Sequence, residues 1–85
     1  MVKLRILADD EEGTLQRAIF EFSKRNIPIE GLFYRRGTSG ITMQFSLNRE
    51  EDAQKVLRNL SKIYGVRNAE IVLVKEGEIF GESIL

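Results

Sequence analysis

The chain has 85 residues, of which 42% are hydrophobic and 31% charged, and its 13 basic and 13 acidic side chains give no net charge. This length predicts one domain, and the charge balance argues against a protein that holds nucleic-acid phosphates. Neither histidine nor cysteine occurs, which excludes disulfides, thiolate metal ligands and histidine-activated nucleophiles. No apolar run is long enough to span a membrane. We therefore expect a cytoplasmic protein that is not an enzyme, needs no cofactor and does not bind a membrane.

The first 25 residues predict a strand followed by a helix. Residues 2–8 have the two-residue period of a strand, because apolar side chains occupy every second position. Residues 14–25 have helical spacing, with Thr14 as the expected N-cap. The apolar stripe of this helix consists of Leu15, Ala18, Ile19 and Phe22. Between the strand and the helix lies an acidic run, residues 9–12, which ends at Gly13.

The middle of the chain predicts a β-hairpin. Pro28 is incompatible with a continuing helix and marks the start of an extended segment. We expect one side of this segment to carry Ile27, Ile29 and Phe33, and the other side to carry Leu32 and Tyr34. The sequence Gly37-Thr38-Ser39-Gly40 supplies the turn, because two glycines tolerate the backbone angles of tight turns. Residues 41–47 then alternate and present one fully apolar face.

The last third of the chain predicts a second helix and a final strand. Asn48 and Glu51 have the spacing of a capping box, and Gly65 is expected to end the helix. The expected buried stripe consists of Ala53, Val56, Leu57, Leu60, Ile63 and Tyr64. Residues 69–75 form the predicted strand, whose apolar residues on both sides favour cover on both faces. Residues 76–85 form a C-terminal extension that is expected to dock on the domain or on a partner.

The order strand, helix, strand, strand, helix, strand predicts the fold class. It is typical of an α+β ferredoxin-like βαββαβ sandwich, a four-stranded antiparallel sheet with two helices on one face. We expect this domain to cover residues 1–75. Many unrelated functions occur on the same fold, so function has to be argued from particular residues.

The acidic run before Gly13 has two interpretations. In the first, the acids only stabilise the helix, because negative charge is favourable near the positive end of the helix dipole. Alternatively, the run is a ligand loop, in which backbone N–H groups after Gly13 receive a carboxylate and Asp10 receives an ammonium group. Four acids would repel an anion, so this second interpretation favours a zwitterionic or cationic ligand. A metal site is not expected, because neighbouring side chains cannot all converge on one ion.

The extended segment after Pro28 is expected to be a sheet edge that pairs with a second copy of the chain, since such pairing covers unpaired backbone groups. The residues expected at this interface are Ile29, Gly31, Leu32 and Phe33. An RNA-binding surface near Arg35 and Arg36 is a further alternative. The outward side of residues 41–47, however, lacks the aromatic residues on which RNA-binding sheets stack bases. We therefore expect a homodimer and no nucleic-acid partner.

Three stretches of the chain carry a family resemblance. Asp10-Glu11-Glu12-Gly13-Thr14-Leu15 is similar to an Asn-x-Pro-Gly-x-Leu loop. The run Phe22-Ser23-Lys24-Arg25-Asn26-Ile27-Pro28-Ile29-Glu30-Gly31-Leu32 is similar to one ending in Asn-Ile-Glu-Ser-Leu. The third stretch, Leu60-Ser61-Lys62-Ile63-Tyr64-Gly65-Val66, is similar to Leu-Asn-Lys-Leu-x-x-Val. These patterns resemble ACT domains, the small-molecule-sensing modules of amino-acid metabolism. The closest likeness is to the short, single-domain form of the regulatory (small) subunit of acetolactate synthase.

The resemblance implies a regulatory module that binds a small amino acid at a dimer interface and acts on a catalytic enzyme subunit. It puts the effector between the loop of one subunit and the second strand of its neighbour. The ligand-binding residues that it implies are Asp10, Glu11, Glu12, Gly13, Thr14, Leu15, Ile27, Pro28 and Ile29. Asp10 and Pro28 stand where the resembled subunits have amide side chains that help to bind a branched-chain amino acid. A dimerisation domain that has lost its ligand is therefore the alternative.

Overall fold

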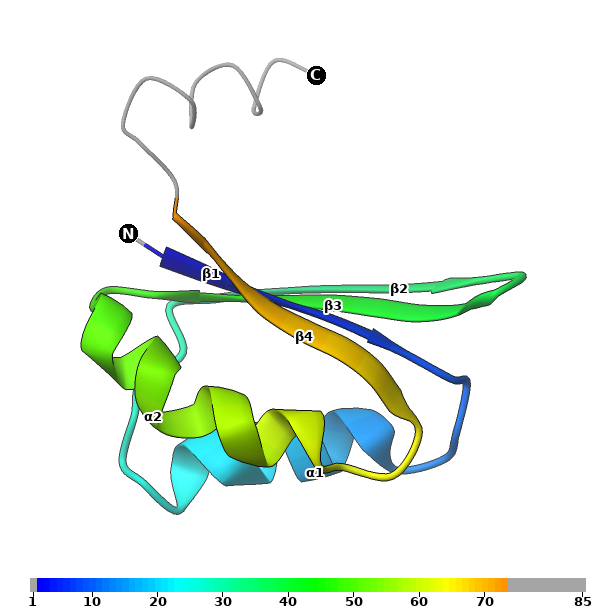
Figure 1. Cartoon of the computed structure of the whole chain (residues 1–85), viewed down its shortest axis with the longest axis horizontal. Coiled ribbons are helices and arrows are strands. Elements are labelled where there is room, and N and C mark those ends of the chain that lie inside the picture. Colours follow the sequence, from blue (N-terminus) through cyan, green and yellow to red (C-terminus); the bar gives the residue numbers. More distant parts are fainter. Residues whose placement is uncertain (1, 74–85) are drawn as a thin grey trace.

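The computed structural model describes residues 2–73, which form one four-stranded sheet and two helices (Figure 1). The elements are β1 (Val2–Ala8), α1 (Thr14–Ser23), β2 (Gly31–Gly37), β3 (Gly40–Leu47), α2 (Glu50–Ser61) and β4 (Val66–Leu73). The strand order is β2-β3-β1-β4, and every neighbouring pair is antiparallel. Both helices lie on one face of the sheet, so the predicted α+β ferredoxin-like sandwich is confirmed. The expected extension over 76–85, and residues 74 and 75 of the expected last strand, lie outside the described residues.

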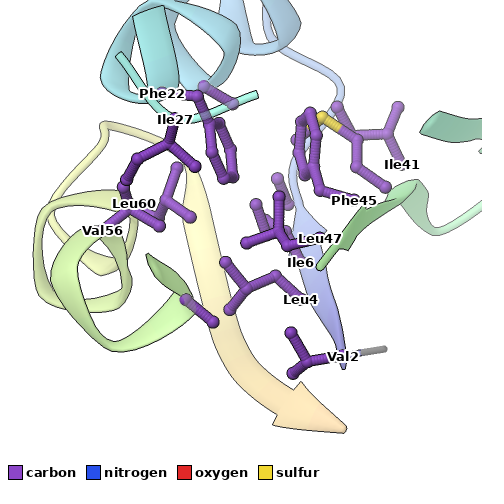
Figure 2. Close-up of a cluster of buried hydrophobic side chains, with 14 residues drawn as sticks. Val2, Leu4, Ile6, Phe22, Ile27, Ile41, Phe45, Leu47, Val56 and Leu60 are labelled. Carbon is purple, nitrogen blue, oxygen red and sulfur yellow. The ribbon is translucent and has the colours of Figure 1, made fainter. Parts of the chain in front are cut away.

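The core lies between the sheet and the helices, and β1 and β3 supply its sheet side (Figure 2). Every second residue of these two central strands is buried. The pairs Leu4–Phe45 and Ile6–Met43 bring the two apolar rows side by side. Phe45 also packs against Phe22 of α1, with ring centroids 4.7 Å apart. Burying each large apolar side chain contributes roughly 1.5–3 kcal/mol, which fixes the face that each central strand turns to the helices. Neither helix of residues 2–73 has the length and apolar composition that a membrane span requires.

The edge strand β2 turns its faces in a way that differs from the expectation. Leu32 and Tyr34 pair with buried residues of β3 and therefore lie on the helix-covered face. Phe33 pairs with Gln44 on the open face. The prediction that Phe33 shares a side with the isoleucines flanking Pro28 is therefore wrong. Those isoleucines pack against the core before β2 begins, so the alternation of the strand does not extend back to them.

The ends of α1 also differ from the predicted residues 14–25. Gly13, with a φ of 86°, is the N-cap and Thr14 is the first helical residue, so the prediction of Thr14 as the cap is wrong. The helix ends at Ser23 because Asn26 adopts a left-handed φ of 57°. The next backbone N–H then bonds to a carbonyl of the last helical turn at 3.1 Å, a common way to close a helix end.

The start of α2 has no side-chain cap, so the predicted capping box is wrong. Arg49 occupies the N-cap position, and Asn48 instead donates its amide to the carboxylate of Glu30 at 3.1 Å. Asp52, which is 7% exposed, accepts a hydrogen bond of 3.2 Å from the Arg49 guanidinium. This hydrogen bond raises the pKa of Arg49.

The connection from α2 to β4, and β4 itself, correct several further expectations. Tyr64 is 76% exposed, so it does not belong to the buried stripe of α2. The helix ends at Ser61, so the prediction that Gly65 ends it is wrong. Gly65 instead takes a positive φ of 88° in the turn that follows, and β4 begins at Val66 and not at residue 69 as expected. Val72 lies half-buried on the open face. No element within residues 2–73 covers that face (Figure 1), so the expected cover of the last strand on both sides is not found there.

An ion-pair group stabilises the C-terminal half of α1. The carboxylate of Glu21 accepts a 2.7 Å hydrogen bond from Arg25 and lies 3.3 Å from the Lys24 ammonium. Burial raises the pKa of Glu21, but the hydrogen bonds from Arg25 and Lys24 outweigh burial and hold that pKa below its ordinary value of 4.5. The charged form of this carboxylate is therefore the one that the folded chain stabilises.

Candidate functional site

The candidate site begins at the loop of residues 9–13, which joins the end of β1 to the start of α1 (Figure 1). The backbone N–H of Asp9 donates to the carbonyl of Gly65 at 2.8 Å, which ties the loop to the turn before β4. The Arg17 guanidinium donates to the carbonyl of Glu12 at 3.3 Å. The hydroxyl of Thr14 donates to the carbonyl of Glu11 at 3.0 Å. The loop is therefore held by contacts at both of its ends.

The N–H of Thr14, the first residue of α1, donates to the carbonyl of Glu11 at 3.4 Å, so the helix start offers its backbone donors from the next residues. No side chain caps it, and its first turn contains no acidic residue. The acids precede the helix and do not lie within that first turn, where the helix dipole favours them most. Gly13 holds the left-handed conformation that lets the chain turn into the helix. This geometry weakens the purely electrostatic interpretation of the acidic run and leaves the helix start open to a carboxylate.

The acids of the loop point to different parts of the molecule. Asp9 pairs with Arg67 of β4, with 2.8 Å between Oδ1 and Nε. Asp10 pairs with Arg36 of β2, with 3.1 Å between Oδ2 and Nε. Glu11 packs beside the turn at residue 65. Within residues 2–73, no three acidic side chains converge into a possible metal site.

A single chain does not bring the two parts of the expected ligand site together. The loop precedes α1, whereas Ile27, Pro28 and Ile29 follow it at its other end (Figure 1). A helix of ten residues is about 15 Å long. Leu15 and Ile29 both pack against the core, and Pro28 is exposed. A site that uses both parts therefore requires a second copy of the chain.

The edge strand β2 is the most exposed apolar element among residues 2–73. Leu32 is 44% exposed, Phe33 51% and Tyr34 38%. The other residues of β2 are exposed as well, apart from the half-buried Gly31. An uncovered edge of this kind invites pairing with another strand. Of the residues expected at a dimer interface, Gly31, Leu32 and Phe33 therefore lie on an available edge, whereas Ile29 precedes the strand and packs against the core.

Sequence reasoning missed the two arginines that hold the loop. Arg36 lies 26 positions after its partner Asp10, and Arg67 lies 58 positions after its partner Asp9. No local sequence pattern predicts such pairs.

The open face of the two central strands carries Lys3, Arg5, Leu7, Thr42, Gln44 and Ser46. This face of β1 and β3 therefore lacks the aromatic residues of a base-stacking surface.

The fold is shared with solved structures of low sequence identity. The ACT domain from GTP pyrophosphokinase of Chlorobium tepidum, a solution structure, is 18% identical, and the match covers 88% of each chain with a TM-score of 0.72. The C-terminal domain of the MgtC protein from Mycobacterium tuberculosis is 18% identical, with 88% of this chain and 87% of that chain covered and a TM-score of 0.67. The regulatory subunit of aspartate kinase from Thermus flavus is 17% identical, with 82% and 49% covered and a TM-score of 0.64. No family profile matches the chain, and no curated protein sequence is significantly similar to it.

The strand order and the one-sided helix layer define a ferredoxin-like α+β domain. Its structural neighbours include ACT domains, and the chain has the fold of an ACT domain. At identities of 17–18%, this likeness establishes the fold, and the site is argued from the residues themselves.

Proposed function

We propose that this chain is a non-catalytic regulatory module that binds a small amino acid at a homodimer interface and acts on a catalytic enzyme subunit. The observation that carries the proposal is the Asp10–Arg36 ion pair, which holds the loop of residues 9–13 at the hairpin end of the exposed edge strand β2. The enzyme that we propose is acetolactate synthase of branched-chain amino-acid biosynthesis. That part of the proposal rests on the sequence resemblance.

A two-fold dimer along β2 would complete the site. In antiparallel pairing of two copies of β2, the start of one strand lies beside the end of the other. Residues 27–29 of the partner subunit would then lie next to Arg36, and therefore next to Asp10. The two halves that α1 separates within one chain would meet across this interface.

The Asp10–Arg36 pair has the chemistry of a zwitterion site. A bound amino acid can place its ammonium group on the Asp10 carboxylate and its carboxylate on Arg36 or on the uncapped N–H groups of α1. The apolar side chain of the ligand would contact residues 27–29 of the partner subunit, two of which are isoleucines. This arrangement favours a zwitterionic amino acid with an uncharged side chain over a ligand with two negative charges.

Calorimetric titration of the full chain with each common amino acid tests the proposal. We expect one group of amino acids to bind, and Asp10→Ala to weaken that binding by about tenfold or more, because it removes a charge-assisted hydrogen bond. Gly13→Val should also weaken it, since valine disfavours the φ of 86° at this position. Glu50→Gln on α2, which likewise removes one negative charge from an exposed position, is the charge-matched control and should bind normally. Absence of heat with every amino acid would refute the effector site.

A second candidate is a dimerisation domain that has lost its ligand. Asp9 and Asp10 already have arginine partners, and Pro28 offers no amide donor. This candidate predicts a dimer whose dissociation constant is the same with and without amino acids. It also predicts co-purification with a catalytic subunit that no amino acid changes. If one amino acid changes the dissociation constant of the dimer, the regulatory module is supported and the ligand-free dimerisation domain is refuted.

A further inference from the structure

A depression lies on the open face of the sheet, away from the helices. It has a volume of about 340 Å³, within the range of small-molecule sites. Its lining consists of Leu7, Arg35, Thr42, Arg67 and the hairpin residues 37–40. Two guanidinium groups and three hydroxyl groups contribute to this lining, and no carboxylate does. The composition is that of a site for an anion.

The sheet register explains why these side chains share one face. Arg35 pairs with Thr42, and Thr42 pairs with Leu7, so the three form one row across β2, β3 and β1. The next row, which contains Ile41 and Ala8, is buried against the helices. Successive rows of a sheet alternate between faces. The row of Arg35 is therefore fixed on the open face.

A β-bulge brings Arg67 to the same place. Leu7 pairs with Asn68, but Ala8 pairs with Val66, so Arg67 is the extra residue of β4 at this point. Bulges re-aim side chains and are frequent beside functional sites. Here the bulge lets Arg67 line the depression of the open face.

Gly40 makes room for the guanidinium of Arg67. A Cβ atom at position 40 would collide with Nη2 of Arg67 and with the carbonyl of Ala8, and the φ of 132° also favours glycine. Nη2 of Arg67 donates to the carbonyl of Ser39, while its Nε pairs with Asp9. The guanidinium is therefore oriented by fixed contacts at the edge of the depression.

Arg35 supplies the charge that has no counterpart. No acidic side chain within residues 2–73 forms an ion pair with it. Arg5, on the same face, is paired with Glu70 at 3.3 Å. An unpaired guanidinium beside a second, oriented one is a suitable receptor for a phosphate or carboxylate group.

We propose that this depression binds a small anion that carries phosphate or carboxylate groups, between Arg35 and Arg67 and with hydrogen bonds from Thr38, Ser39 and Thr42. This site lies on the opposite face of the sheet from the helix-side contacts of β2, and it does not depend on the amino-acid site. An anion is also the class of ligand that the acidic loop disfavours.

Nuclear magnetic resonance titrations of the ¹⁵N-labelled full chain test the proposal with inorganic phosphate, pyrophosphate and succinate, and with sodium chloride at matched ionic strength. We expect saturable shifts of the amides at residues 37–42 and 66–68. Arg35→Gln, which removes one exposed charge, should weaken binding by up to about fivefold and Thr42→Val by less, whereas Arg58→Gln is the charge-matched control. If only phosphate and pyrophosphate saturate the shifts, the ligand carries a phosphate group. If only succinate does, the ligand carries carboxylate groups. Either outcome supports the site.

Three results would overturn the proposal. The first is that sodium chloride produces the same shifts as the test anions. The second is an equal loss of binding in Arg35→Gln and Arg58→Gln, which would indicate general electrostatic attraction. The third is that a short single-stranded RNA binds far more tightly than pyrophosphate and shifts the amides around Lys3 and Arg5 as well. Amino-acid binding has its own readout at residues 9–15, so its failure is distinguishable from failure of this site.

Discussion

Leu32→Lys on β2 is expected to weaken the proposed homodimer, whereas Leu73→Lys on β4 should leave it unchanged. The two leucines lie on opposite edges of the sheet, and both lie on the helix-covered face, where Leu32 pairs with Phe45 and Leu73 with Val2. Their side chains are similarly accessible, at 44% and 59% exposed. The two variants therefore make the same chemical change at the two edges of one domain.

The size of the effect follows from the exposed part of Leu32. Complete burial of a leucine side chain contributes about 1.5–3 kcal/mol, so the 44% that is still exposed offers about 1 kcal/mol per subunit. A two-fold interface contains each residue twice, which makes the loss about 2 kcal/mol per dimer. Because each 1.4 kcal/mol is a factor of ten, the dissociation constant should rise roughly 30-fold. The lysine charges add to this loss.

Sedimentation velocity over a series of concentrations measures both dissociation constants, and circular dichroism verifies that each variant folds. If Leu73→Lys weakens the dimer as much as Leu32→Lys, β2 is not the interface. If the unmodified chain is a monomer throughout the series, the dimer and the composite effector site are both refuted.

Three further predictions concern the fold that supports these sites. Phe45→Ala should lower the free energy of unfolding by about 3–5 kcal/mol, measured by urea denaturation; a loss below about 1 kcal/mol would contradict the role of this ring in the core. Gly40→Ala should lower the melting temperature, because its Cβ would collide with the carbonyl of Ala8 as well as with Arg67, whereas a Cβ at position 37 would make only an ordinary contact of 3.8 Å with the carbonyl of Gly40, so Gly37→Ala should not; equal melting temperatures would disprove the steric argument. Glu21→Gln should make unfolding less dependent on pH. Since the pKa of Glu21 is lowered on folding, its charge stabilises the chain above its ordinary value of 4.5, and this stabilisation is lost as the pH falls through the folded-state pKa. Parallel pH profiles of the two chains in urea would refute this account.

The fold could be predicted because its strongest signals are local. β3 alternates without exception, so its buried face follows from the pleat of a strand. Each helix has one apolar stripe that only a single sheet face can cover. The order of these elements then leaves few arrangements of the sheet. The topology was therefore accessible from the sequence.

The faces of β2 and the contacts of the acidic loop could not be predicted, for a different reason. β2 has no buried face of its own, so its alternation gives no signal, and the isoleucines before it belong to the core without belonging to the strand. The bulge at Arg67 shifts the register of β4 by one residue, which moves that side chain away from the face that simple alternation assigns. Arg36 meets Asp10 only because the hairpin end of β2 and the end of β1 lie close together. Such contacts are properties of the assembled sheet.

Arg67 connects the two candidate sites, and its geometry limits how strongly they can influence each other. Its Nε holds Asp9 of the effector loop, while its Nη2 bonds to the hairpin that borders the anion depression. An anion that draws the guanidinium toward Arg35 would weaken the contact with Asp9 and so loosen the loop. The Asp9–Arg67 pair is about half exposed, and exposed ion pairs contribute about 0–1 kcal/mol. Because coupling cannot exceed the free energy of the contact that transmits it, each ligand can change the affinity of the other by at most about fivefold through this pair.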